Sequence, residues 1–196
     1  MIRRILVALA TLAIAGCSDQ AVVNTGEPPV RTETAISTPE TTPPSNAHLV
    51  NAFEYVAHVG ETTGYYFTTP SGKWRCAILT RVKAGCQASS GWQSGLGITG
   101  EPDSVLVASG QATTPNAIVV DRDGDPQFVA LEKPEFWLVP GAARVLPLNR
   151  ILAAAGFRCN VQESGVSCQS EPSGKGFTFS ADGYTQQYSA VPPNAP

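Results

Sequence analysis

The sequence contains 196 residues, of which 13 are Lys or Arg and 16 are Asp or Glu, so that 15% are charged and the net charge at pH 7 is −3. Soluble domains average roughly 25% charged residues. The 18 Gly and 16 Pro recur between short apolar runs, which excludes a helical bundle or coiled coil. The acidic balance and the two His argue against a nucleic-acid-binding protein and a multi-histidine metal enzyme, and we expect no cofactor.

Residues 1–16 have the pattern of a secretory signal, with two Arg, an apolar run that ends at Ile14, and small residues before Cys17. The run is shorter than the roughly 20 apolar residues that cross a bilayer. The segment 14–17 resembles the bacterial lipobox, which implies cleavage before Cys17 and acylation of its thiol, with palmitate as a typical chain. The alternative is a plain secreted protein, which leaves an odd number of Cys in an exported chain.

Residues 17–47 follow as a lipidated Cys and a predicted tether. Between Ser18 and Ala47 there are five Pro, six Thr and three Ser but no aromatic residue, a composition typical of disorder. This segment spans roughly 30 Å as a coil and about 90 Å as polyproline II. The two or three acyl chains of a lipoprotein hold it stably at a membrane. We therefore expect an exported protein attached to the outer face of the cell membrane, with the membrane as its first partner.

Residues 48–191 are predicted to form one small, mainly β (α+β) antiparallel domain, followed by a tail at 192–196. Apolar residues at helical spacing over 45–59, behind Ser45 or Asn46 and before Gly60, predict a short N-terminal helix. The segment 148–155 fits a helical turn or a strand. Strands are predicted at 64–68, 74–80, 83–87, 104–108, 117–121, 127–131, 136–139, 144–146, 156–162, 165–170, 176–180 and 184–188.

Two segments share one pattern, an aromatic residue, Arg and Cys, then a turn, then Cys-Gln. Cys76 and Cys86 are ten residues apart, and Cys159 and Cys168 are nine apart. Opposite positions on a hairpin lie within disulfide range. Of the three possible connectivities we favour Cys76 with Cys86 and Cys159 with Cys168, because export favours oxidation and a Cys₄ metal site would need closer pairs. The second hairpin then has a two-residue loop, and the first needs a three-residue loop or a bulge.

These segments also resemble a group of secreted proteins and lipoproteins of actinobacteria. That group shares a "PSGN-x-x-C" start and a "GV-x-C…G-x-GF-x-x-S…Y" end, which correspond here to residues 67–76, Gly165–Cys168, Gly176–Ser180 and Tyr184. Lys73 stands where Asn is usual, and residues 89–149 match nothing in the pattern. The resemblance implies a location and an architecture but no activity.

Two further sequence features are candidate sites. Asp121, Asp123 and Asp125 follow calcium-loop spacing, but Pro126 stands where that loop needs Gly, so a turn is the favoured interpretation and weak calcium binding the alternative. Trp92 lies in a polar loop and is the candidate binding residue, with a loop anchor as the alternative.

No sequence pattern identifies catalytic residues. Both His lie in the opening segment, and no spacing singles out a pair of carboxylates. We therefore expect a non-enzymatic binding or assembly module for an envelope glycan, lipid or protein, and not an enzyme. The alternative is a carboxylate-dependent hydrolase of envelope glycans.

Overall fold

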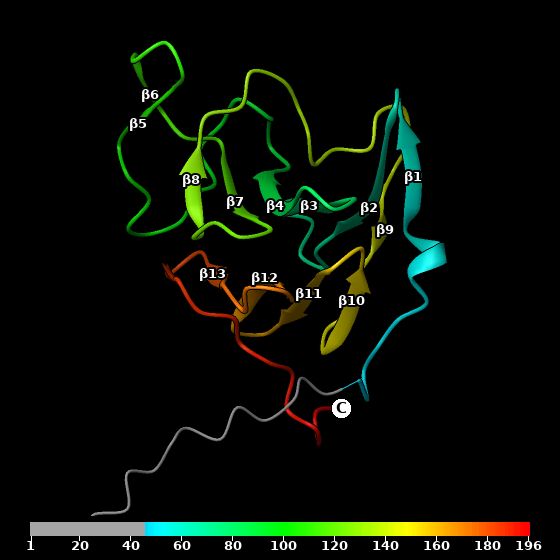
Figure 1. The fold of residues 1–196 in the computed structure, drawn as a ribbon. Helices are drawn as coiled ribbons and strands as arrows, with labels where there is room; N and C mark the ends of the chain where they lie inside the picture. The colour runs from blue at the N-terminus through cyan, green and yellow to red at the C-terminus, as the bar shows by residue number, and fades with distance from the viewer. Residues whose placement is uncertain (1–45) are drawn as a thin grey trace, which may run out of the picture. The chain divides into compact units, whose positions relative to one another are not determined.

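The computed structural model describes residues 46–196, and this part of the chain is mainly antiparallel β-structure (Figure 1). The first sheet has the order β1-β2-β3-β4-β7-β8, and β9 pairs in parallel with β2. Its strands are β1 (Val56–Val59), β2 (Thr62–Thr68), β3 (Trp74–Leu79), β4 (Lys83–Ala88), β7 (Ala117–Asp121), β8 (Gln127–Val129) and β9 (Arg144–Val145).

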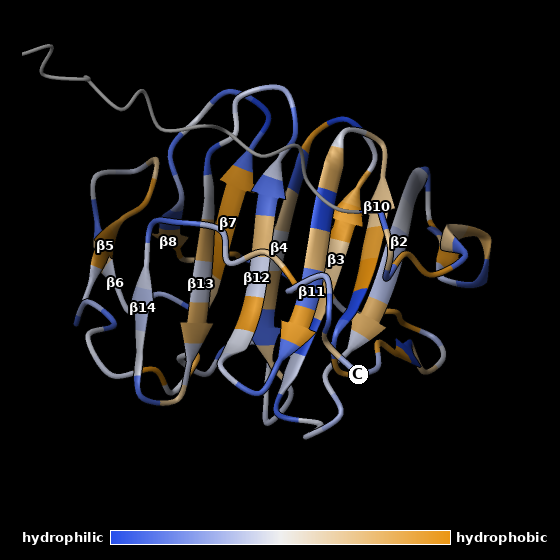
Figure 2. Ribbon diagram, turned by 90° about the horizontal axis from the view of Figure 1, so that it is seen from below, coloured by the Kyte–Doolittle hydropathy of each residue, from blue (hydrophilic) through white to orange (hydrophobic). Residues whose placement is uncertain are grey.

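The second sheet is a meander in which each strand pairs with the next. It consists of β10 (Arg150–Ala154), β11 (Phe157–Gln162), β12 (Gly165–Ser170), β13 (Gly176–Ser180) and β14 (Gly183–Thr185). A separate ribbon is formed by β5 (Val105–Leu106) and β6 (Ala112–Thr113). The two sheets form two layers, with β3, β4 and β7 facing β11 and β12 (Figures 1 and 2).

Both disulfides lie in the core between the sheets. Cys76 bonds to Cys86 and Cys159 to Cys168, with 4.1 Å between the Cα atoms of each pair. All four side chains are fully buried. The predicted pairing is confirmed. The surrounding core includes Phe67, Trp74, Ile78, Ile118, Leu152, Phe157, Val166, Phe177 and Phe179.

The register of both hairpins follows from these pairs. Gln162 lies opposite Gly165, which leaves a two-residue loop as predicted. Leu79 lies opposite Lys83, which leaves three residues, and the middle one, Arg81, has a left-handed φ of 60°. A residue in this region closes a three-residue hairpin loop without splaying the strands. The predicted three-residue loop is therefore confirmed.

The outer face of the first sheet is covered by the segment 131–139, which we name the crossing segment (Figure 1). A strand was predicted over 136–139, and this prediction is wrong. The fully buried Gln87 side chain accepts hydrogen bonds from the backbone N–H groups of Glu135 and Phe136. These bonds satisfy backbone groups that a strand would pair in a ladder, while Phe136 packs on Gly85.

The outer face of the second sheet is polar and is covered by residues 186–193, the C-terminal segment. The carbonyl of Ser189 accepts hydrogen bonds from the side-chain amides of Asn160 and Gln162, at 2.9 and 3.0 Å. Thr178 Oγ1 donates to the carbonyl of Gln187 and accepts from the N–H of Ser189. Side chains of the sheet thus replace a further strand as partners of this backbone.

The predicted N-terminal helix is wrong. Residues 46–196 contain no α-helix, and only Ala52–Glu54 form a single 3₁₀ turn, η1, capped by the Asn51 side chain. The residues before it bridge to β10, and those after it become β1. Helical spacing of apolar residues was outweighed because Val56 and Val59 are β-branched and pair along β2.

Candidate functional site

A pocket of about 670 Å³ opens on the outer face of the first sheet. It lies between the β1–β2 turn, the β3–β4 turn and the crossing segment. Its apolar wall comes from Val59, Leu79, Val82 and Pro134, and its polar groups come from Glu61, Thr62, Thr63, Tyr66, Thr80, Lys83, Lys133 and Glu135. Polar groups that converge on a concave surface fix the orientation of a ligand, and this pocket is richer in them than the usual small-molecule site.

Tyr66 reaches this pocket because Gly64 has no side chain. A Cβ on Gly64 would lie 2.8 Å from Cε2 and 3.1 Å from the hydroxyl oxygen of Tyr66, so the ring lies directly over the glycine. Burial raises the pKa of Tyr66 above its ordinary value of 10, and the nearby negative charge of Glu135 raises it further. Its hydroxyl therefore stays protonated at neutral pH and can donate a hydrogen bond.

A half-buried ion pair forms the charged part of the pocket. Lys83 Nζ lies 2.8 Å from Glu135 Oε2, and both side chains are largely removed from solvent. Lys83 comes from the start of β4, whereas Glu135 comes from the crossing segment. Gln87 fixes Glu135 by accepting its backbone N–H at 3.1 Å, so the β4 strand that supplies the cation also positions the anion.

The crossing segment is held at two further points. The Asn116 amide donates to the carbonyl of Leu131 at 2.8 Å and accepts its N–H at 2.7 Å. The Arg75 guanidinium stacks on the ring of Trp137, 4.1 Å from its centroid. Gln87, Asn116 and Arg75 all contact the crossing segment, so the wall that this segment contributes to the pocket is held in place by the sheet.

Two smaller pockets adjoin one another at a different end of the sandwich, with volumes of about 370 and 560 Å³. They share Ser71, Lys73, Trp74 and Ala181. Trp74 offers no free hydrogen-bond donor there, because its indole N–H already donates to the carbonyl of Leu96. Its ring packs edge-on against Phe179. We therefore regard the pocket beside Tyr66 as the better site.

Trp92 lies between β4 and β5 and is partly buried. Its carbonyl accepts a hydrogen bond from the Gln87 side chain at 3.4 Å, and the residue lines none of these three pockets. The structure thus places it beside the residue that holds the crossing segment, as expected of a loop anchor. A binding role for its ring stays a prediction.

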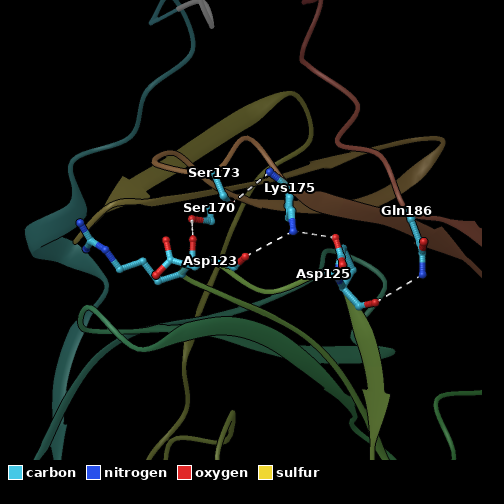
Figure 3. A network of polar contacts seen from close by, with 8 residues as sticks. Asp123, Asp125, Ser170, Ser173, Lys175 and Gln186 are labelled. Carbon is cyan, nitrogen blue, oxygen red and sulfur yellow. Dashed lines mark hydrogen bonds and ion pairs between the residues drawn. The ribbon is translucent and has the colours of Figure 1, made fainter. Parts of the chain in front are cut away.

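The segment 121–126, predicted to be a turn with weak calcium binding as the alternative, contacts the second sheet through Lys175 (Figure 3). Lys175 Nζ lies 3.0 Å from a carboxylate oxygen of Asp125 and donates to the carbonyl of Asp123 at 3.3 Å. Asp121 ends β7, opposite Lys83. Within residues 46–196 no group of three or more His, Cys, Asp or Glu side chains could hold a metal ion. Lys175 thus pairs with one of the three aspartate carboxylates, and weak calcium binding stays an untested alternative.

The remaining predicted residues are placed as follows. His48 is buried and its Nε2 lies 3.3 Å from the carbonyl of Pro193, whereas His58 on β1 contacts Thr63 Oγ1 at 3.0 Å. The two His side chains therefore have different partners, one in the C-terminal segment and one on β2. Cys17 lies outside the described residues. Residues 46–196 contain no helix that is long and apolar enough to cross a membrane.

The pocket residues Tyr66, Lys83 and Glu135 were not predicted from the sequence. They come from β2, β4 and the crossing segment, and only the strand order brings them together. One local pattern could have indicated the position of the Tyr66 ring, because Gly64 lies two residues before it. Residues i and i+2 of a strand share a face, and a glycine leaves room for a neighbouring ring.

No protein-family model matches the chain, and neither a curated protein nor a solved structure is significantly similar to it. The resemblance to actinobacterial lipoproteins stays a prediction.

Proposed function

We propose that this chain is an exported lipoprotein, anchored through acylated Cys17 to the outer face of the cell membrane, whose β-sandwich is a non-enzymatic binding module. The signal pattern and the two core disulfides support export. The pocket beside Tyr66 carries the binding part of the proposal, because its charged and hydroxyl groups converge over an apolar wall and are held by a rigid sheet.

The pocket chemistry favours a hydroxyl-rich ligand such as an envelope glycan fragment. The Tyr66 phenol and the Lys83 ammonium donate hydrogen bonds, and the Glu135 carboxylate accepts them. Threonine hydroxyls around the rim can do both. Alternating donors and acceptors match sugar hydroxyls, and the apolar wall formed by Val59 and Leu79 matches the C–H faces of a sugar ring.

Calorimetric titration with soluble fragments of cell-wall glycan tests the binding role. We expect Lys83→Gln and Glu135→Gln to weaken binding by about tenfold or more, the usual loss when one charged hydrogen bond to a ligand is removed. Lys175→Gln is the matched control, since it removes a paired lysine outside the pocket and should leave the affinity unchanged. Equal affinity in all variants would contradict the proposed site.

The anchor is tested separately. Mass spectrometry of the intact native chain should show acyl chains on Cys17, and Cys17→Ser should abolish them and weaken retention in the membrane fraction. A native chain without acyl mass on Cys17 would refute lipidation and leave the glycan-binding assay unaffected.

One observation favours a glycan hydrolase as the second candidate, because Glu61 and Glu135 line the same pocket. Glycoside hydrolysis uses two carboxyl groups, one of which must be protonated as the general acid. Glu135 is already paired with Lys83, so Glu61 is the carboxyl group assigned to the acid in this alternative. The test is release of reducing ends from cell-wall glycan by the native protein. Release that Glu61→Gln abolishes would favour the hydrolase over the binding module.

A further inference from the structure

One edge of the sandwich carries a row of exposed apolar side chains. Of the eight large apolar residues that are exposed within residues 46–196, five lie here: Leu49, Phe53, Val56, Val145 and Leu148. Phe53 is 83% exposed. Single exposed apolar residues are common on protein surfaces, whereas a continuous group marks a surface that contacts something.

Pairing of the strands shows why these residues share an edge. β1 and β9 both pair with β2, β1 along Thr62–Tyr65 and β9 along Phe67–Thr68, so that they lie end to end beside it. The η1 turn fills the gap between them. It is fixed there by the Tyr55 hydroxyl, which donates to the carbonyl of Val145 at 3.3 Å.

The second sheet ends at the same edge with β10 (Figure 2). Leu49 bridges to Ile151, whose carbonyl accepts the N–H of Val50 at 2.9 Å, and Leu148 lies two residues before β10. The apolar row therefore runs across the edge strands of both sheets. The Asn51 side chain accepts the N–H of Phe53, and this cap holds the turn that carries the most exposed ring.

The position of the preceding chain indicates what contacts this edge. The described residues begin at Asn46, only three residues before Leu49 and seven before Phe53. Cys17 lies 29 residues before Asn46, and the span predicted for such a stretch is roughly 30 Å as a coil and about 90 Å as polyproline II. An anchor at Cys17 would therefore keep this edge, which lies close to where the described chain begins, at high effective concentration near the lipid surface.

We propose that the edge formed by Leu49, Phe53, Val56, Val145 and Leu148 docks onto the lipid bilayer to which Cys17 is attached. This inference relies on the anchor of the proposed function. Arg144 is paired with Glu54 at 3.0 Å, whereas Arg150 is exposed two residues after Leu148. Binding should accordingly have an apolar part that persists at high salt concentration.

Flotation with vesicles of phosphatidylethanolamine and phosphatidylglycerol tests the inference on the mature chain carrying Cys17→Ser, which binds lipid only through its own surface. We expect the chain to float with the vesicles and Phe53→Ser to weaken this association by about tenfold, the effect of losing one inserted aromatic side chain. Leu106→Ser is the matched control, since Leu106 is 78% exposed on β5, away from this edge, and should change nothing.

Two results would overturn the inference. The first is an absence of flotation, or equal flotation of the native and Phe53→Ser chains. The second is a concentration-dependent dimer in light scattering that Phe53→Ser abolishes, which would assign the edge to a second copy of the chain. Cys17 is replaced in every sample of this experiment, and glycan binding is measured at the pocket beside Tyr66. Neither result therefore bears on the proposed anchor or on the proposed glycan site.

Discussion

The hairpins β3–β4 and β11–β12 share a sequence pattern but differ on their outer faces. Toward the core they are equivalent, since each contributes a buried disulfide and an aromatic ring, Trp74 or Phe157. On the outside, Gly85 receives the ring of Phe136, whereas the corresponding Ser167 contacts the Thr178 hydroxyl at 2.7 Å. One hairpin thus carries an apolar crossing segment and the other a hydrogen-bonded chain end.

The same contrast holds for the paired Arg and Gln residues of the two motifs. Arg75 stacks on Trp137, whereas Arg158 forms an ion pair with Glu171 at 3.0 Å. Gln87 is fully buried and holds the crossing segment, whereas Gln169 is only partly buried. A repeated motif therefore specifies the disulfide core, and the residues on its outer face decide what is built on it.

The largest expected effect comes from removing the ring that docks the crossing segment. Phe136→Ala should lower the free energy of unfolding by about 3–5 kcal/mol, because a fully buried phenylalanine is lost and a cavity remains over Gly85. Urea unfolding of the native protein and of Phe136→Ala measures this difference in the free energy of unfolding. A loss below about 1 kcal/mol would show that the crossing segment is not packed as described.

The two disulfides should contribute almost equally, since they close rings of similar length. The loop-entropy relation gives about 2–3 kcal/mol for separations of ten and nine residues. Urea unfolding of Cys76→Ala/Cys86→Ala and of Cys159→Ala/Cys168→Ala checks this. If one pair proved dispensable while the other was essential, the equivalence of the two core faces would be refuted.

The two glutamines allow a matched comparison at the same motif position. Gln87→Ala should cost about 1–3 kcal/mol, because the N–H groups of Glu135 and Phe136 lose their acceptor. Gln169→Ala should stay within about 0.5 kcal/mol of the native value, as surface changes usually do. Chemical denaturation measures the free energy of unfolding of both variants. Equal losses would contradict the different roles of Gln87 and Gln169 on the outer faces of the two hairpins.

The smallest effect is expected at alkaline pH. Burial raises the pKa values of Tyr55, Tyr66 and Tyr188 above 10, so folding favours their protonated forms. This contribution is complete below the unfolded-state pKa of about 10 and is lost as the pH rises through the higher folded-state values. Urea midpoints at pH 9 and pH 11 should therefore differ less for Tyr66→Phe than for the native protein; an unchanged difference would contradict the burial of this phenol.

Local patterns predicted much of the fold. Strand alternation and hairpin spacing predicted both disulfides, and β10 resolves the segment 148–155, for which helix and strand had both been possible. The N-terminal helix was wrongly predicted because pairing of Val56–Val59 with β2 is a long-range effect that periodicity does not contain. The strand at 136–139 was wrong for a related reason, since its backbone partners are the side-chain atoms of Gln87, 48 residues away from Glu135 in sequence.

The candidate site could not be predicted in the same way. Its three central residues belong to separate elements, and the ion pair between Lys83 and Glu135 exists only because the crossing segment returns over β4. Trp92 was singled out because a large ring in a polar loop is conspicuous in a sequence. The structure places its backbone carbonyl beside the Gln87 side chain and its residue outside the three pockets, and a binding role for its ring stays a prediction.

Binding of an envelope ligand in the pocket beside Tyr66, as proposed, is tested most directly by an NMR titration of the mature Cys17→Ser chain with soluble cell-wall glycan fragments. Backbone amide shifts should change around residues 61–66, 80–83 and 133–135. Shifts confined to the surroundings of Trp92 or Trp74, or no shifts at all, would contradict it.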